Sequence, residues 1–180
     1  MKTYIALFRG INIGGHNRLP MKELVKLFQQ LGFHNVRTYI QSGNAVFQSN
    51  DRNASRLSER IGAEIRKSHG FEPKVLLLEP KDLEKAIALN PFPEAVSDPK
   101  SLHVLFLTSA PKNPELERLD EIRGKSERFK LSNRFFYLHT PEGVGRSKLV
   151  ASAERLLGVP ATGRNWRTIC EIMALTKEYH

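Results

Sequence analysis

The sequence contains a single cysteine, a single tryptophan and no long run of apolar residues. With Cys170 alone, neither an internal disulfide bond nor a zinc site built from several cysteines is possible. No apolar stretch approaches the roughly 18 residues of a transmembrane helix, and the N-terminal MKTYIALFRG becomes charged too early for a signal peptide. We therefore expect a cytoplasmic protein without a membrane span.

Acidic residues are also scarce. The chain has 19 Asp and Glu against 28 Lys and Arg, which gives a net charge of +9 and a pI near 9.8. The surplus is spread over both halves without a basic tail, so it belongs to folded surfaces. Such a surface favours contact with polyanions such as nucleic acid. Proteins without a nucleic-acid partner can carry the same charge, so charge alone leaves both readings open.

The first half of the chain predicts the element order β-α-β-β-α-β. The apolar run at residues 4–8 indicates a buried strand, and Pro20 suits the first position of the helix that follows. NVRTYIQ and NAVFQS predict a hairpin that turns at Ser42-Gly43. Asn53 can cap a second helix that Gly70 ends, and KVLLLEP predicts a fourth strand. This order is typical of the split βαβ, or ferredoxin-like, pattern.

The second half begins after a proline-rich stretch, NPFPEAVSDPKS, which predicts a linker. LHVLFLTS then predicts a strand, and residues 114–122 predict a helix with Leu116, Leu119 and Ile122 on its inward side. RFKLS and RFFYLHT predict a hairpin, and Gly158 ends the helix that follows. Thr168 and Glu171 have capping-box spacing at the start of a C-terminal helix.

Together these patterns predict an α+β protein of two ferredoxin-like (split βαβ) units, residues 1–95 and 96–180. Each unit is expected to have an antiparallel sheet with helices packed on one face. The second unit is expected to be a divergent repeat of the first.

Three stretches carry a family resemblance: ALFRGINIGGHNRLPM, TYIQSGNAVF and TGRNWRT. In the same order, they resemble the signature of the bacterial family known as domain of unknown function 1697, and the likeness extends over essentially the whole chain. The resemblance implies two α+β domains, each related to the ferredoxin-like arrangement. It offers no catalytic residues to carry over, and we expect no cofactor.

Four polar stretches chosen for their motifs contain no Asp or Glu, although 19 of the 180 residues are acidic: residues 9–18, 39–48, 143–150 and 159–168. A carboxylate beside an arginine would occupy the N–H donors that an incoming phosphate or carboxylate needs. Without carboxylates, these stretches also offer no site for Mg²⁺ or Ca²⁺ and no pair of catalytic acids. They predict a donor-rich lining for an anionic ligand. The candidate ligand-binding residues are Arg9, Asn12, His16, Asn17, Arg18, Gln41, Ser42, Asn44, Arg146, Lys148, Arg164, Asn165, Trp166 and Arg167.

Two of these stretches contain glycines near a predicted helix start. Gly14-Gly15 is expected to let the backbone approach a ligand and to open toward a helix N-terminus, which favours anions. EGVGRSKL places Arg146 and Lys148 beside Ser147, which can cap the next helix. In both places the alternative is a plain turn. Neither has the spacing of a dinucleotide-binding or P-loop motif, so no nucleotide is specified.

Trp166 and His16 are the most distinctive side chains of the acid-free stretches. Trp166 lies between Arg164-Asn165 and Arg167, which would suit stacking on a nucleobase. We favour the alternative, a buried anchor for the last helix with the arginines still outward. His16 is the best candidate proton carrier, but no acid or cysteine near it in the sequence can orient it. Hydrogen bonding to a ligand or to its own loop is therefore favoured, and we name no catalytic residue.

Three classes of function remain open. The first, which we favour, is a module that binds a phosphorylated or other anionic ligand, either a small molecule or a nucleic acid. The second is an enzyme that acts on a small phosphorylated substrate with His16 as acid or base. The third is a structural or partner-binding protein whose polar motifs brace the contact between its two halves. The sequence specifies neither the ligand nor the oligomeric state.

Overall fold

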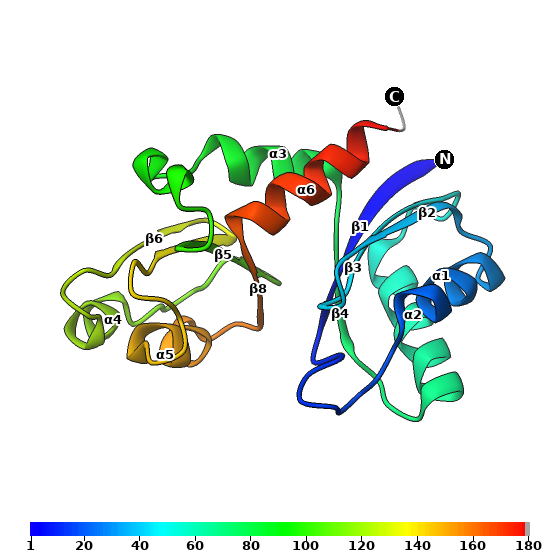
Figure 1. The fold of residues 1–180 in the computed structure, drawn as a ribbon, viewed down its shortest axis with the longest axis horizontal. Coiled ribbons are helices and arrows are strands. Elements are labelled where there is room, and N and C mark those ends of the chain that lie inside the picture. Colours follow the sequence, from blue (N-terminus) through cyan, green and yellow to red (C-terminus); the bar gives the residue numbers. More distant parts are fainter. Residues whose placement is uncertain (179–180) are drawn as a thin grey trace. The chain divides into compact units, whose positions relative to one another are not determined.

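The structure, a computed structural model, describes residues 1–178 and confirms the α+β class. The chain divides into two compact units. The first comprises Met1–Glu84 and the C-terminal segment that begins at Cys170, and the second comprises Lys85–Ile169. Figure 1 gives the order of the helices and strands along the chain.

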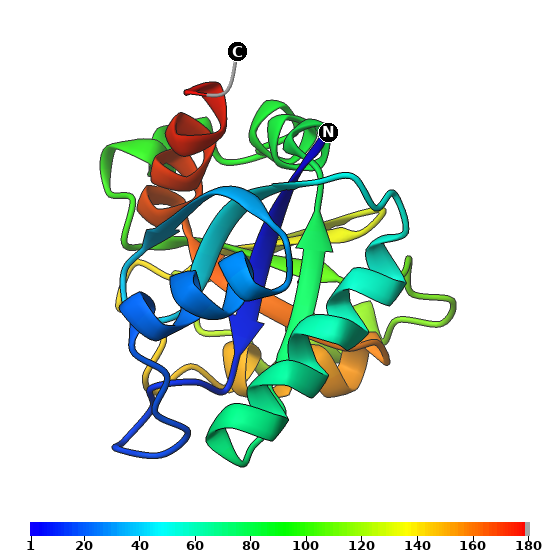
Figure 2. The same ribbon diagram turned by 90° about the vertical axis from the view of Figure 1, so that its right-hand side faces the viewer.

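The first unit is built on a four-stranded sheet in the order β2-β3-β1-β4, in which every neighbouring pair is antiparallel. Two helices, α1 and α2, cover one face of this sheet (Figure 2). The order of elements and of strands is that of the split βαβ pattern, as predicted. Its elements are β1 (Lys2–Arg9), α1 (Met21–Gln30), β2 (His34–Tyr39), β3 (Asn44–Ser49), α2 (Ala54–His69) and β4 (Lys74–Leu78).

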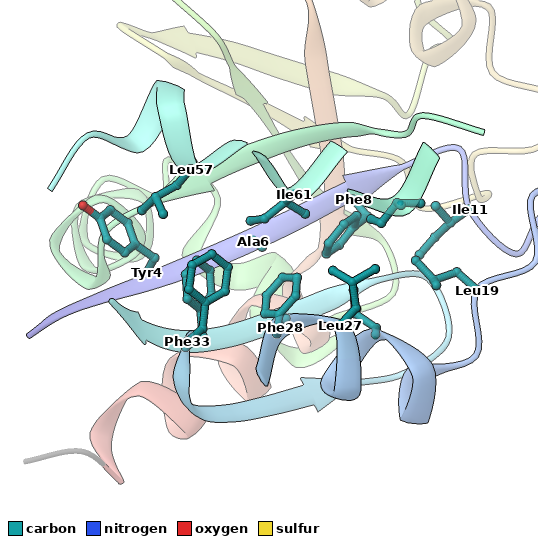
Figure 3. Close-up of a cluster of buried hydrophobic side chains, with 14 residues drawn as sticks. Tyr4, Ala6, Phe8, Ile11, Leu19, Leu27, Phe28, Phe33, Leu57 and Ile61 are labelled. Atoms are coloured by element: carbon teal, nitrogen blue, oxygen red, sulfur yellow. The ribbon is translucent and has the colours of Figure 1, made fainter. Parts of the chain in front are cut away.

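The core of the first unit lies between its sheet and these helices (Figure 3). Tyr4, Ala6 and Phe8 point from alternate positions of β1 into this layer, as the side-chain period of two along a strand requires. Phe28 of α1 stands edge-on to the ring of Phe47, with 5.0 Å between the ring centroids. The core therefore holds β1 and α1 firmly on either side of the connection between them.

The second unit repeats this arrangement. Its sheet has the order β6-β7-β5-β8, again antiparallel throughout, so β5 takes the place that β1 has in the first unit. The elements are β5 (Leu102–Leu107), α4 (Leu116–Ile122), β6 (Arg128–Ser132), β7 (Phe135–His139), α5 (Lys148–Leu157) and β8 (Ala161–Asn165). The remaining helices are α3 (Pro80–Ala88), the 3₁₀ helix η1 (Pro93–Ser97) and α6 (Trp166–Lys177).

The core of the second unit confirms the predicted stripe of α5, from which Leu149, Ala153, Leu156 and Leu157 pack against the sheet. One inward residue was predicted wrongly. Leu116, the first residue of α4, is 37% exposed, whereas Leu119 is buried and Ile122 packs against the core, both as predicted. The proline-rich linker contains the short helix η1 instead of being wholly irregular.

The helix ends test the predicted caps. Asn53 caps α2 and Ser147 caps α5, each through a side-chain oxygen that accepts a backbone N–H, as predicted. Pro20 precedes the first helical residue of α1 instead of being that residue. The capping box at Thr168 was wrong, because α6 begins two residues earlier and Asn165 accepts the N–H of Thr168. None of the helices within residues 1–178 has the length and apolar character needed to cross a bilayer.

Candidate functional site

The connection between β1 and α1 is a small hairpin that projects from one end of the first sheet (Figure 2). The backbone N–H of Asn12 donates to the carbonyl of Asn17 at 3.0 Å, and that of His16 donates to Ile13 at 2.9 Å. Ile13 and His16 form an isolated antiparallel bridge. We call residues 10–19 the β1–α1 hairpin loop.

Gly14 and Gly15 form the tip of this hairpin. Their φ angles of +56° and +79° are those of a type I′ turn, whose two central residues both have positive φ. The expectation that these glycines open toward the N-terminus of α1 was wrong. Residues 16–20 separate them from the helix, and the glycines are needed to reverse the chain within two residues. Gly14 and Gly15 therefore do not place an anion at the N-terminus of α1.

Both ends of the hairpin loop are anchored in the core. Ile11 and Leu19 lie next to each other at the edge of the apolar cluster, close to Phe8, and both are buried (Figure 3). Their burial fixes where the chain leaves the sheet and where it returns. The exposed segment between them, residues 12–18, therefore projects from a fixed base.

Asn12 makes most of the side-chain hydrogen bonds at the base of the hairpin loop, where it joins the rest of the first unit. Its side-chain Oδ1 accepts the N–H of Leu19 at 2.7 Å, while Nδ2 donates to the carbonyls of Leu19 at 2.9 Å and Gln41 at 2.8 Å. Asn17 adds a bond from Nδ2 to the carbonyl of Gly10 at 2.9 Å. The amides of Asn12 and Asn17, expected to face a ligand, thus hold the loop to itself and to residue 41.

The second acid-free stretch is the turn between β2 and β3, residues 40–43, and it lies beside the hairpin loop. Phe8 donates its N–H to the carbonyl of Gly43 at 2.9 Å. Asn44 is buried, and its Nδ2 donates to the carbonyl of Tyr39 at 2.9 Å and to Ser42 Oγ at 3.3 Å. The amide of Asn44 therefore shapes this turn, whereas the side chains of Gln41 and Ser42 are on exposed residues.

Ile40 opens this turn with φ at +50°, in the left-handed region that a β-branched residue rarely adopts. Its side chain is 48% exposed, and Ile13 on the hairpin loop is 66% exposed. Sequence reasoning missed both isoleucines, because it searched for polar groups and treated apolar residues as core. The signal available was their place inside otherwise polar, glycine-containing stretches.

The arginines and the histidine at this end of the sheet are exposed residues. Arg9 is the last residue of β1, and His16 and Arg18 follow on the hairpin loop. Within residues 1–178, neither Arg18 nor the ring of His16 has a hydrogen-bond or ion-pair partner. Among the described residues, no carboxylate hydrogen-bonds to His16.

In the second unit, Arg146, Ser147 and Lys148 line a hollow of about 540 Å³ at the N-terminus of α5. Two carboxylates, those of Glu127 and Glu142, line the same hollow. Glu127 also accepts the N–H of Gly124 at 2.8 Å through Oε2. The third acid-free stretch is therefore not acid-free in space, because folding brings Glu127 from a distant part of the sequence.

The fourth stretch forms β8 and the start of α6. Asn165 caps α6, and Trp166 is only 5% exposed, so its ring is not an open stacking surface. Arg164 donates from Nη1 to the carbonyl of Gly163 at 2.8 Å, and burial lowers the pKa of its guanidinium to about 10. Of the four candidate ligand-binding residues in this stretch, Arg164 to Arg167, only Arg167 is exposed.

The structure thus brings together the acid-free stretches 9–18 and 39–48 within the first unit. We call the hairpin loop and the residue 40–43 turn together the loop pair. Across the part of the chain that the structure describes, no group of three or more His, Cys, Asp and Glu side chains is placed to hold a metal ion. The chemistry available at the loop pair is hydrogen bonding and positive charge.

Comparison with known proteins gives a family and a fold. The family model described as "Protein of unknown function (DUF1697)" matches residues 1–137. A similar solved structure is that of the conserved bacterial protein SP0830 from Streptococcus pneumoniae. It has a TM-score of 0.68 and 26% sequence identity, over 96% of this chain and 97% of that one. No curated protein matches the chain. The chain therefore belongs to the DUF1697 family of proteins of unknown function.

Proposed function

We propose that the loop pair of the first unit binds a phosphorylated or otherwise anionic ligand. The observation that carries this proposal is the bond from Asn12 to Gln41, which holds two acid-free stretches side by side. Around it lie the cationic Arg18 and the N–H groups of His16 and Gln41. All belong to residues that are exposed to solvent.

The positive charge of Arg18 and the low entropic cost of ordering the loops both favour the binding of an anion. An arginine without a carboxylate partner keeps its N–H donors in water, where an anion can take them in a bidentate arrangement. The base of the loop pair is already hydrogen-bonded, so a ligand need order only the side chains. Binding that does not have to order a loop retains more of its interaction free energy.

The structure also weighs against an enzyme at this place. A proton carrier needs a partner that fixes its orientation, and none of the described residues hydrogen-bonds to the ring of His16. Asn12, Asn17 and Asn44 bond to backbone carbonyls within the first unit, so their amides shape these loops. These amides build the site, and the arginine and histidine are left for the ligand.

A thermal-shift screen tests the proposal. Inorganic pyrophosphate, sugar phosphates, nucleotides and short oligonucleotides would be added to the protein and to the variants Arg18→Gln and Lys26→Gln. Lys26 is exposed on α1 and loses the same charge away from the loops. We expect at least one probe to raise Tm, and Arg18→Gln to weaken its binding at least fivefold while Lys26→Gln does not. No shift with any probe, or an equal loss in both variants, would overturn the proposal.

A further inference from the structure

We infer that the anion bound by the loop pair is a B-form DNA duplex, and that the hairpin loop enters its major groove. This inference rests on the proposed function and narrows it to one ligand class. Three features of the hairpin loop carry it: its convex and slender shape, its exposed apolar side chain, and the sign of the charge around it.

The first feature is shape. The hairpin loop protrudes from the end of the sheet (Figure 2), so its own surface is convex and calls for a concave partner. Gly14 and Gly15 have no side chains, and a Cβ placed on either would meet nothing closer than 4.0 Å. The tip is therefore as thin as a bare two-stranded ribbon. The major groove of B-form DNA, about 12 Å wide, admits a two-stranded ribbon.

The second feature is Ile13, which lies next to the tip and is 66% exposed. An isoleucine at this position does nothing for the core, since Ile11 and Leu19 already anchor both ends of the loop. In the major groove, the apolar contact that a base offers is the methyl group of thymine. Ile40 on the neighbouring turn is a second exposed isoleucine, held in a strained backbone conformation.

The third feature is charge. An exposed isoleucine could also enter an apolar pocket of a partner protein, but the charge around the hairpin loop favours DNA. Residues 9–20 and 39–48 contain no carboxylate, while Arg18 and His16 are exposed on the hairpin loop. The whole chain carries a net charge of +9, which a phosphate backbone complements. An A-form RNA duplex has a major groove too deep and narrow for side chains, so it fits this loop less well.

Fluorescence anisotropy with labelled nucleic acids tests the inference. A 20-base-pair DNA duplex, one of its strands alone and an RNA duplex of the same sequence would be titrated with the protein at several salt concentrations. We expect the DNA duplex to bind at least tenfold more tightly than the single strand or the RNA. Arg18→Gln should reduce the slope of log K against log salt by about 1, because it removes one phosphate contact.

Ile13→Thr supplies the second test, because threonine keeps the β-branch and removes apolar surface. We expect it to weaken binding to the DNA duplex at least threefold with an unchanged salt slope. Val144→Thr, at another exposed apolar residue, is the matched control and should bind as the unaltered protein does. Thermal melting of each variant separates lost binding from lost folding, and Ile13→Thr should melt as the unaltered protein does.

The outcomes distinguish the two proposals. If pyrophosphate or a nucleotide binds in an Arg18-dependent way and the DNA duplex does not, the inference fails and the proposed function stands. If neither binds, both fail. Tighter binding to the single strand or the RNA, or duplex binding that neither Ile13→Thr nor Arg18→Gln weakens, would also overturn the inference.

Discussion

The side-chain amide of Asn12 lies 2.8 Å from the carbonyl oxygen of Gln41, a residue 29 positions further along the chain. This bond joins two connections that the sequence keeps apart. Because the same amide also pairs with both backbone groups of Leu19, it acts as one extra peptide group in the hairpin loop. An amide is the side chain that can donate and accept in this way.

Replacing Asn12 with aspartate is expected to lower the free energy of unfolding by about 2 kcal/mol, since the second carboxylate oxygen would face two carbonyls that it cannot bond. Asn17→Asp is the control, because Asn17 donates a single bond at an exposed position. It should cost less than half as much. Urea denaturation of both variants gives the comparison, and equal losses would contradict the role given to Asn12.

Gly43 is expected to tolerate substitution less well than Gly14, although both have positive φ. A Cβ on Gly43 would lie 2.5 Å from Ile11 Cδ1 and 2.7 Å from Phe8 Cβ, whereas one on Gly14 would meet only the ring of His16 at 4.0 Å. We expect Gly14→Ala to cost about 1 kcal/mol through backbone strain alone. Gly43→Ala should cost about 3 kcal/mol, because overpacking adds to this strain.

The midpoint and slope of urea unfolding give the free energy of unfolding of the two glycine variants. We expect this free energy to differ by at least 1 kcal/mol between them. A result in which Gly14→Ala is as harmful as Gly43→Ala would show that the tip of the hairpin loop is itself packed against something. That outcome would remove the slender tip on which the DNA inference depends.

Asn165 and not Thr168 is expected to set the start of α6. Asn165→Ala should lower the free energy of unfolding by about 1 kcal/mol, the usual cost of losing an N-cap. Asn165→Asp keeps an oxygen that can accept the N–H of Thr168, so it should restore most of this stability. If both variants unfold as the unaltered protein does, Asn165 is not the cap.

Stability is expected to fall as the pH drops below about 6.5, because two histidines, His103 and His139, are partly buried. Burial lowers the pKa of His139, and the positive charge of Arg128, which donates to its Nδ1 at 2.9 Å, lowers the pKa further; Glu94 and Asp98 oppose this. Burial also lowers the pKa of His103, whose Nδ1 has no partner among the described residues. Below the ordinary pKa of histidine the unfolded chain binds more protons than the folded one, so protons favour unfolding.

The check is the free energy of unfolding at pH 7.5, 6.5 and 5.5 for the unaltered protein and for His139→Gln. We expect the loss between pH 7.5 and 5.5 to be smaller in the variant. The carboxyls of Asp51, Glu79 and Glu94, whose pKa values are lowered by hydrogen bonds from cationic side chains, add to the loss only at lower pH. A stability that stays constant down to pH 5.5 would contradict the lowered pKa values of both histidines.

The candidate site could be predicted only in part. The absence of acids from residues 9–18 and 39–48 is a property of sequence, and it led to the loop pair. The roles of the side chains could not be predicted from the sequence. Asn12 and Asn44 are polar residues like Gln41, but their side-chain amides are hydrogen-bonded to backbone carbonyls. Glu127, which faces the same hollow as Arg146, is separated from it by a whole hairpin.

What the sequence alone determined is local. Apolar periodicity located most helices and strands, and the caps at Asn53 and Ser147 were readable because a cap is a bond between residues three apart. What only the tertiary structure decided is every feature made by residues far apart in the chain. Residues 161–165 form β8 because β5 pairs with them, with Val104 opposite Arg164, and no apolar alternation in ATGRN announces a strand. The direction of the hairpin loop depends in the same way on Ile11 and Leu19 finding the core, since burial is a property of the folded chain and not of a stretch of it.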